Sequence, residues 1–232
     1  MHVLGIETSG RTGTQAIVAD GQIIAESTLS TKGRRHAQTL VQETRSLLDA
    51  VAFKPTDIQV IAISNGPGSF TGLRVGAAFA KTFCFATGAQ LVAVDTLRCI
   101  AERIDPEIPA VHVIEDAQRG DVFANLYTMT GEGERHAADA TTIIAVADFA
   151  ASLEPGAKIS GPGLRRYADQ LHAFSSADEA LWDPQAREVA VIGSAQAARG
   201  EYSDITTYEP FYLRKSAAEE KRDAANSPPE QP

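Results

Sequence analysis

The sequence predicts an α/β protein built from two lobes. Hydrophobic residues in the first hundred positions change repeatedly between strand-like and helix-like spacing. The length of 232 residues is long for a single domain and short for two large ones. We therefore expect a first lobe at residues 1–100, a smaller second lobe at 101–215 and a tail at 216–232.

The first lobe is expected to begin with three antiparallel strands. The dipeptide Asp20-Gly21 between two apolar runs is a strong hairpin signal. A helix, a strand, a second helix and a strand should follow, which gives a mixed sheet. The expected elements lie at 2–6, 14–19, 22–27, 34–51, 57–64, 71–86 and 90–94.

The second lobe is patterned less clearly. Its expected strands lie at 110–115, 122–128 and 158–160. Its expected helices lie at 142–153, 164–173 and 189–199, and an ordered segment follows at 208–213.

Composition restricts the classes of function. The formal net charge is −9, and a protein that binds nucleic acid by itself usually has a basic surface. The apolar segment 75–94 is interrupted by polar residues, and no signal peptide precedes the first strand, so we expect a cytoplasmic protein. Cys84 and Cys99 lie in apolar surroundings and are expected to be buried thiols.

A glycine-rich turn begins at Gly66 and leads from a strand into a helix. Backbone N–H groups and a positive helix end converge in such a turn, which suits phosphate. The phosphate-loop motif needs Lys after its final glycine, whereas Leu73 follows Gly72 here. A tight connection capped by Ser69 or Thr71 is the alternative.

Two other turns carry polar side chains. Thr8, Ser9 and Gly10 follow the first strand and could form a vestigial phosphate loop or a plain turn. The stretch 116–121 (DAQRGD) holds two carboxylates and an arginine, and we interpret it as a hairpin with ion pairs rather than an acid–base pair.

No metal site is expected. A zinc or iron site needs three or four converging ligands, and none of the five histidines has another three to five residues away. His36 lies near the start of the first long helix, and Leu40 stands where a second helical ligand would be.

The helix at 71–86 is apolar on nearly all sides. Gly72, Gly76 and Ala80 form a stripe of small residues that would let another helix approach closely. A helix with this pattern is buried on more than one side. The second side must be covered either by the helix at 34–51 or by a partner chain.

The stretch 63–81 (ISNGPGSFTGLRVGAAFAK) resembles the TsaB (YeaZ) family of bacterial tRNA threonylcarbamoyladenosine synthesis. Supporting segments follow in family order: 35–37 (RHA), 94–97 (VDTL), 116–122 (DAQRGDV) and 210–214 (PFYLR). The resemblance covers residues 3–215. Members of the family often have Asp where this chain has Glu7.

The resemblance implies a two-lobed actin, Hsp70 and sugar-kinase (ASKHA) fold, with a five-stranded mixed sheet in each lobe. It implies no cofactor and a non-catalytic role, in which the chain binds the catalytic TsaD subunit and is joined by the TsaE ATPase. Contact with tRNA would be made only through the complex. The alternatives are a small-molecule kinase of the same superfamily and, with less support, a metalloprotease.

The expected partner surface lies on the two long helices. A homodimer through the same surface is left open for the chain alone. The expected contact residues are His36, Leu40, Leu47, Leu48, Gly72, Leu73, Val75, Gly76, Phe79, Ala80 and Phe83.

Overall fold

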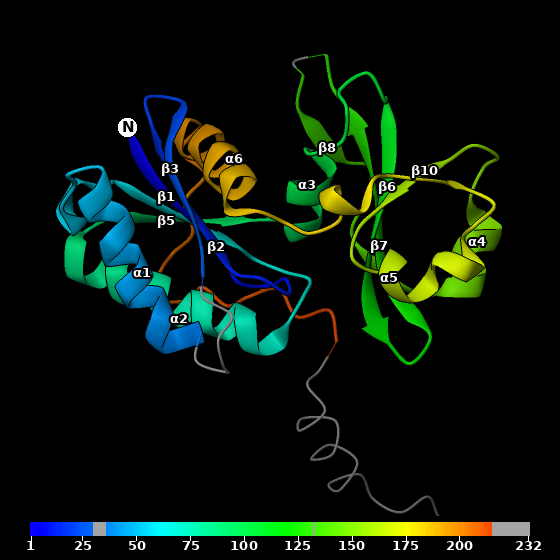
Figure 1. The fold of residues 1–232 in the computed structure, drawn as a ribbon, viewed down its shortest axis with the longest axis horizontal. Coiled ribbons are helices and arrows are strands. Elements are labelled where there is room, and N and C mark those ends of the chain that lie inside the picture. The colour runs from blue at the N-terminus through cyan, green and yellow to red at the C-terminus, as the bar shows by residue number, and fades with distance from the viewer. Residues whose placement is uncertain (30–35, 132, 215–232) are drawn as a thin grey trace, which may run out of the picture.

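Two β-sheets divide the molecule into two lobes that lie side by side (Figure 1). The computed structural model describes residues 1–29, 36–131 and 133–214. The expected tail at 216–232 lies outside these residues. The predicted two-lobed α/β architecture is confirmed.

The first sheet has the strand order β3-β2-β1-β4-β5. Its strands are β1 (His2–Glu7), β2 (Thr14–Ala19), β3 (Gln22–Thr28), β4 (Val60–Ser64) and β5 (Gln90–Val94). β1 pairs antiparallel with β2 and parallel with β4, so the sheet is mixed as expected. Asp20 and Gly21 both have positive φ angles, of 49° and 80°, which this two-residue hairpin requires.

Helices cover both faces of the first sheet. These helices are α1 (His36–Ala50), α2 (Phe70–Thr87) and α6 (Ala186–Ala198). Side chains alternate between the two faces of a strand, so Leu4 packs towards α1 and α2 while its neighbour Val3 packs towards α6. Both faces of β1 and β4 are therefore buried, which explains why these strands are nearly continuous apolar runs, whereas edge strand β3 alternates between exposed and partly buried residues.

The second sheet has six strands in the order β11-β10-β6-β7-β8, with β9 also paired to β7. Its strands are β6 (Ala110–Gln118), β7 (Asp121–Met129), β8 (Arg135–Ala137), β9 (Thr142–Ala145), β10 (Lys158–Ser160) and β11 (Ser175–Ser176). Its helices are α3 (Thr96–Ala101), α4 (Val146–Ser152) and α5 (Leu164–Tyr167). Short 3-10 helices lie at Pro55–Asp57, Ala168–Gln170 and Glu179–Leu181. The family resemblance implied five strands in this lobe, and the two-residue β11 makes the sixth.

Several predicted elements differ from the structure. The predicted helix at 142–153 is wrong in its first part, because the β-branched residues from Thr142 form β9 on the edge of β7. The predicted helix at 164–173 breaks after Tyr167 into a 3-10 turn. Sequence analysis missed α3, whose N-cap Asp95 accepts a hydrogen bond from the amide of Leu97 at 2.9 Å.

The end of the chain returns to the first lobe. Helix α6 packs on the first sheet, and the amide of Ser203 donates to the carbonyl of Leu91 on edge strand β5 at 2.8 Å. Further on, the amide of Phe211 donates to the carbonyl of Asn65 at 2.8 Å. The expected second lobe at 101–215 therefore contains segments that complete the first lobe.

Helix α2 sits directly on the loop that follows β1. A Cβ atom at Gly72 would lie 1.8 Å from the carbonyl oxygen of Thr8, and one at Gly76 would lie 2.5 Å from the Thr8 hydroxyl. The Thr8 hydroxyl donates to the carbonyl of Gly72 at 2.8 Å. We expected the stripe of small residues to allow close approach of another helix. In the structure it allows close approach of the loop after β1 instead.

We predict that Gly72→Ala destabilises the fold. Replacing Gly by Ala inside a helix normally stabilises it by roughly 0.5–1 kcal/mol, but overpacking against the Thr8 backbone costs roughly 1–3 kcal/mol. Urea unfolding of the variant should show a lower free energy of unfolding than the wild type. Ala78→Gly, at an exposed position of the same helix, is the control and should lose only about 1 kcal/mol. An unchanged or higher stability of Gly72→Ala would contradict the packing described.

Candidate functional site

A groove of about 1140 Å³ runs between α1 and α2 on the surface of the first lobe. Its walls are mainly apolar, and Lys54 and Arg74 lie among the lining residues. Most of the lining side chains come from the facing sides of the two helices, and Phe53 and Pro55 close the groove at the end of α1. Helices α1 and α2 touch, but they leave this space between them.

The expected contact residues whose side chains the structure describes divide into three groups. Five of them are buried inside the chain and leave almost no surface for a partner, so the expected contact is not available to them: Leu47, Gly72, Leu73, Gly76 and Ala80. Leu40 and Leu48 are also buried and form the floor of the groove. Val75, Phe79 and Phe83 are partly buried and line its walls.

The most exposed apolar side chains of the two helices were not in the expected contact set. Val41 on α1 is 58% exposed and lines the groove, whereas Phe85 on α2 is 87% exposed and is not a lining residue. Phe53 and Phe70 also line the groove. The helical spacing identifies the apolar residues of both helices. It does not show which side of each helix faces the sheet, so it cannot separate buried positions from exposed ones.

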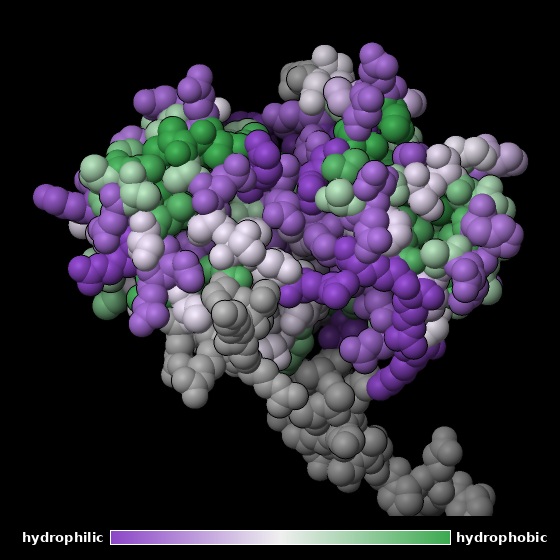
Figure 2. Space-filling view, in the orientation of Figure 1, coloured by the Kyte–Doolittle hydropathy of each residue, from purple (hydrophilic) through white to green (hydrophobic). Residues whose placement is uncertain are grey.

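A second cavity, of about 700 Å³, lies between the two lobes. Its lining includes Ser9 and Gly10 from the first lobe and Glu115 from the second. Burial raises the pKa of Glu115 to about 7. Figure 2 shows hydrophilic residues along the seam between the lobes.

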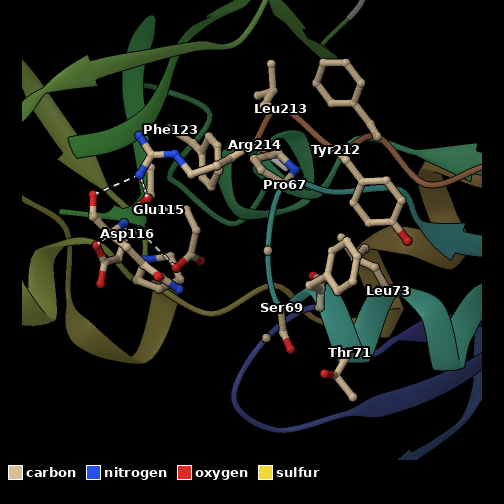
Figure 3. Close-up of a pocket in the computed structure, with 18 of the residues that line it drawn as sticks. Pro67, Ser69, Thr71, Leu73, Glu115, Asp116, Phe123, Tyr212, Leu213 and Arg214 are labelled. Atoms are coloured by element: carbon tan, nitrogen blue, oxygen red, sulfur yellow. Dashed lines mark hydrogen bonds between the residues drawn. The ribbon is translucent and has the colours of Figure 1, made fainter. Parts of the chain in front are cut away.

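The segment before residue 215 crosses this cleft and joins the lobes. The ring of Tyr212 lies 4.7 Å from the ring of Phe70 at the start of α2. The Arg214 guanidinium donates to the carboxylate of Asp121 in the second lobe. It also donates to the backbone carbonyls of Ala117 and Gln118 in the β6–β7 hairpin (Figure 3). One short stretch of chain is thus fixed to both lobes.

The loop after β1 does not present its donors to the cleft. Oε1 of Glu7 accepts hydrogen bonds from the amide of Ser9, the hydroxyl of Ser9 at 2.6 Å and the amide of Gly10 at 2.9 Å. The expectation of a vestigial phosphate loop at Thr8, Ser9 and Gly10 is therefore corrected, because these amide donors are used inside the chain. Burial raises the pKa of Glu7, while the bonds from Ser9 and Gly10 lower it.

Three amides of the glycine turn before α2, those of Gly66, Ser69 and Gly72, are also bonded within the chain. Ser69 caps α2, and its hydroxyl accepts from the amide of Gly72 at 3.2 Å, so the capping interpretation is confirmed. The amide of Ser69 donates to the carbonyl of Ser9 at 2.8 Å, and the amide of Gly66 to the Thr96 hydroxyl at 3.0 Å.

Metal ligands do not gather in the part of the chain that the structure describes. Within residues 1–29, 36–131 and 133–214 there is no group of three or more His, Cys, Asp or Glu side chains that could hold an ion. Leu40, at the position of the second helical ligand, is fully buried in the core. His36 is the first residue of α1, and its side chain lies outside the described part.

The turn at 116–121 is a hairpin with ion pairs, as predicted. Asp116 accepts from Arg166 at 2.9 Å and from the Tyr167 hydroxyl at 3.0 Å, and Asp121 pairs with Arg214. Both carboxylates are therefore occupied by structural partners.

Solved structures place the fold in a known class. YeaZ from Pseudomonas aeruginosa superposes with a TM-score of 0.80 at 24% identity, over 91% of this chain and 99% of that one. With its two mixed sheets and flanking helices, the chain is a two-lobed protein of the actin-like (ASKHA) fold class. In the described residues, no helix combines the length and the apolar character needed to span a membrane.

Sequence comparisons identify the family within this class. The family model for TsaD, tRNA N6-adenosine threonylcarbamoyltransferase, matches residues 22–222. The tRNA threonylcarbamoyladenosine biosynthesis protein TsaB of Escherichia coli is 25% identical over 95% of this chain and 98% of its own length. TsaB of Bacillus subtilis is 32% identical, and that match spans about half of each protein, 55%. The chain belongs to the TsaB/YeaZ family.

We predict that Glu115 makes stability depend on pH. The folded-state pKa of about 7 lies above the ordinary value of 4.5, so folding favours the protonated form. The contribution of Glu115 to the free energy of unfolding is therefore complete below pH 4.5 and is lost as the pH rises through about 7. Glu115→Gln stays neutral, so its free energy of unfolding should vary less over this range and exceed that of the wild type above pH 7.

Urea unfolding midpoints across this pH range would test the prediction. Glu154→Gln, at an exposed position of the second lobe, is the control and should follow the wild-type curve. Identical pH slopes for Glu115→Gln and the wild type would contradict the raised pKa.

Proposed function

We propose that this chain is a non-catalytic subunit of the machinery that forms threonylcarbamoyladenosine in tRNA, next to the anticodon, and that it binds a TsaD-type catalytic subunit through the groove between α1 and α2. The observation that carries the proposal is this apolar groove on a chain that belongs to the TsaB/YeaZ family.

The exposure of apolar side chains supports a partner at the groove. Among the lining residues, Val41 is 58% exposed, and Val75, Phe79 and Phe83 are only partly covered. Full burial of one such side chain contributes roughly 1.5–3 kcal/mol. A helix of the partner laid along the groove would cover several of them at once, which is a recurrent mode of recognition.

Charges in the groove indicate the chemistry of the partner surface. Arg45 is paired with Asp49 at 3.8 Å, whereas Arg74 lies over the ring of Phe70, at 3.9 Å from its centroid. Lys54 is a further lining cation. An apolar helix flanked by acidic side chains would complement this surface.

The internal bonding of the cleft supports a non-catalytic role. A kinase of this superfamily would need free donors for phosphate, whereas Glu7 occupies the amides of Ser9 and Gly10. A metalloprotease would need a second ligand on α1, where Leu40 is part of the core. Neither alternative is favoured by a specific observation.

The proposal includes the wider assembly. A TsaE-type ATPase would join the pair, tRNA would be contacted only through the complex, and the complex would act in the cytoplasm. The net charge of −9 supports the indirect contact with tRNA, because other subunits would have to supply the positive surface. When the chain is alone, a second copy of it would occupy the same groove and form a homodimer.

We predict that Val41→Glu strongly weakens binding of the TsaD-type partner while the fold is kept. An uncompensated charge buried in an apolar interface costs roughly 3 kcal/mol or more, so affinity should fall by about 100-fold. Val191→Glu is a matched control, because Val191 is 47% exposed on α6, on the opposite face of the sheet, and this variant should bind normally.

Light scattering on a size-exclusion column, with the chain alone and then mixed with the partner, would measure the assembly. A one-to-one complex formed by the wild type and Val191→Glu but not by Val41→Glu is the expected result. Equal binding by both variants would show that the interface does not lie at the groove. The absence of any complex with the wild type would refute the proposed function.

A further inference from the structure

The chain passes between the two lobes twice, and the two passages lie close together. The first is at Asp95, which caps α3 and accepts a hydrogen bond from the hydroxyl of Tyr127 in the second lobe. The second leads from Asp183 to Ala186, whose amide donates to the Thr14 hydroxyl of the first lobe at 2.8 Å. Helices α3 and α6, which begin at these passages, touch each other. Two adjacent connections of this kind form a hinge, and a hinge by itself lets the angle between the lobes change.

A third connection lies away from this hinge. The strap, which we define as residues 211–214, lines the cleft between the lobes, whereas residues 94–96 and 183–186 do not. One end of the strap is packed on the first lobe. A Cβ at Gly66 would lie 2.7 Å from the carbonyl oxygen of Phe211, so the two backbones meet with no room for a side chain. This end of the strap is therefore fixed in place.

The other end of the strap is attached to the second lobe by a single side chain. The Arg214 guanidinium donates to the carboxylate of Asp121 and to the carbonyls of Ala117 and Gln118 (Figure 3). The side chains of Arg214 and Asp121 are only 23% and 28% exposed, so salt screens this ion pair less than a fully exposed one. Because the guanidinium is a rigid planar group, three bonds from it fix the direction as well as the distance of the β6–β7 hairpin.

The middle of the strap touches the start of α2. The ring of Tyr212 lies 4.7 Å from the ring of Phe70, and Arg74 covers the same ring at 3.9 Å from its centroid. Phe70 lines both the cleft and the groove between α1 and α2. A rotation of the second lobe about the hinge would have to pull Arg214 off the hairpin or Tyr212 off Phe70, so either movement loses contacts.

We propose that the strap is a lock that holds the two lobes at one angle, so that the cleft keeps one width in the free chain. A hinge that has a third attachment at a distance from it cannot rotate until that attachment is released. Opening or closing of the cleft therefore requires Arg214 to leave the β6–β7 hairpin. This inference concerns the chain alone and does not rest on the proposed function.

The test is the distance between the lobes, measured by double electron–electron resonance between two spin labels. Ser46→Cys on α1 and Ala151→Cys on α4 place one label at an exposed position of each lobe, outside the lining of both cavities. The natural thiols should stay unlabelled because both are buried. Burial raises the pKa of Cys84 to about 11 and that of Cys99 well above its ordinary value.

The labelled chain with its strap intact should give one narrow distance distribution, and Arg214→Ala should give a broader one because the hinge is then released. Arg166→Ala is the matched control. Arg166 also binds the β6–β7 hairpin, through Asp116 at 2.9 Å, but it does so from α5 within the second lobe, so this variant should keep the narrow distribution. Equal distributions for Arg214→Ala and the intact strap, or a broad distribution with the strap intact, would overturn the proposal.

A second variant covers the case in which Arg214→Ala does not fold. Asp121→Lys changes the other side of the ion pair and leaves the strap itself unaltered. The new cation repels the Arg214 guanidinium and should release it from the hairpin. The distance distribution should then broaden as it does for Arg214→Ala, and a distribution as narrow as that of the intact strap would overturn the lock.

Discussion

The contact between α2 and the loop after β1 is the constraint on which the arrangement of the molecule depends. Gly72 and Gly76 allow the helix to rest on Thr8 at backbone distance. This contact determines how close α2 lies to the sheet, and hence the width of the groove that it shares with α1. It also fixes Ser9, whose donors then converge on Glu7. Groove and loop are two results of the same packing.

The same contact explains why the two cavities differ in character. Helix α2 uses its small residues on the sheet side, so its larger apolar residues are left on the other side, where no part of the described chain covers them fully. The cleft between the lobes, by contrast, is crossed by Tyr212 and Arg214 and is held by charged pairs. An apolar surface without cover suits a protein partner, whereas a polar cleft with internal bonds does not need one.

Much of the fold could be predicted because the first lobe has strong local signals. The Asp20-Gly21 hairpin and the apolar periods of α1 and α2 are readable over a few residues. The orientation of Leu47 or Ala80 towards the sheet could not be predicted, because it depends on contacts between residues far apart in sequence. For the same reason the pattern gave no sign that Glu7 turns inward: its hydrogen bonds depend on how Gly68 and Pro184 enclose the loop. The apolar Val41 was visible in the sequence, but its exposure was not.

The return of the chain to the first lobe has a consequence for synthesis on the ribosome. All five strands of the first sheet have been made by residue 94, yet the helix that covers the Val3 face is made only at 186–198, and the segment on edge strand β5 comes later still. A nascent chain therefore carries an uncovered apolar sheet face while the whole second lobe is translated, and domains normally begin to fold in order of synthesis. The first lobe is completed only after Ser203 has been made, so a partner that recognises the finished lobe selects chains that extend at least that far.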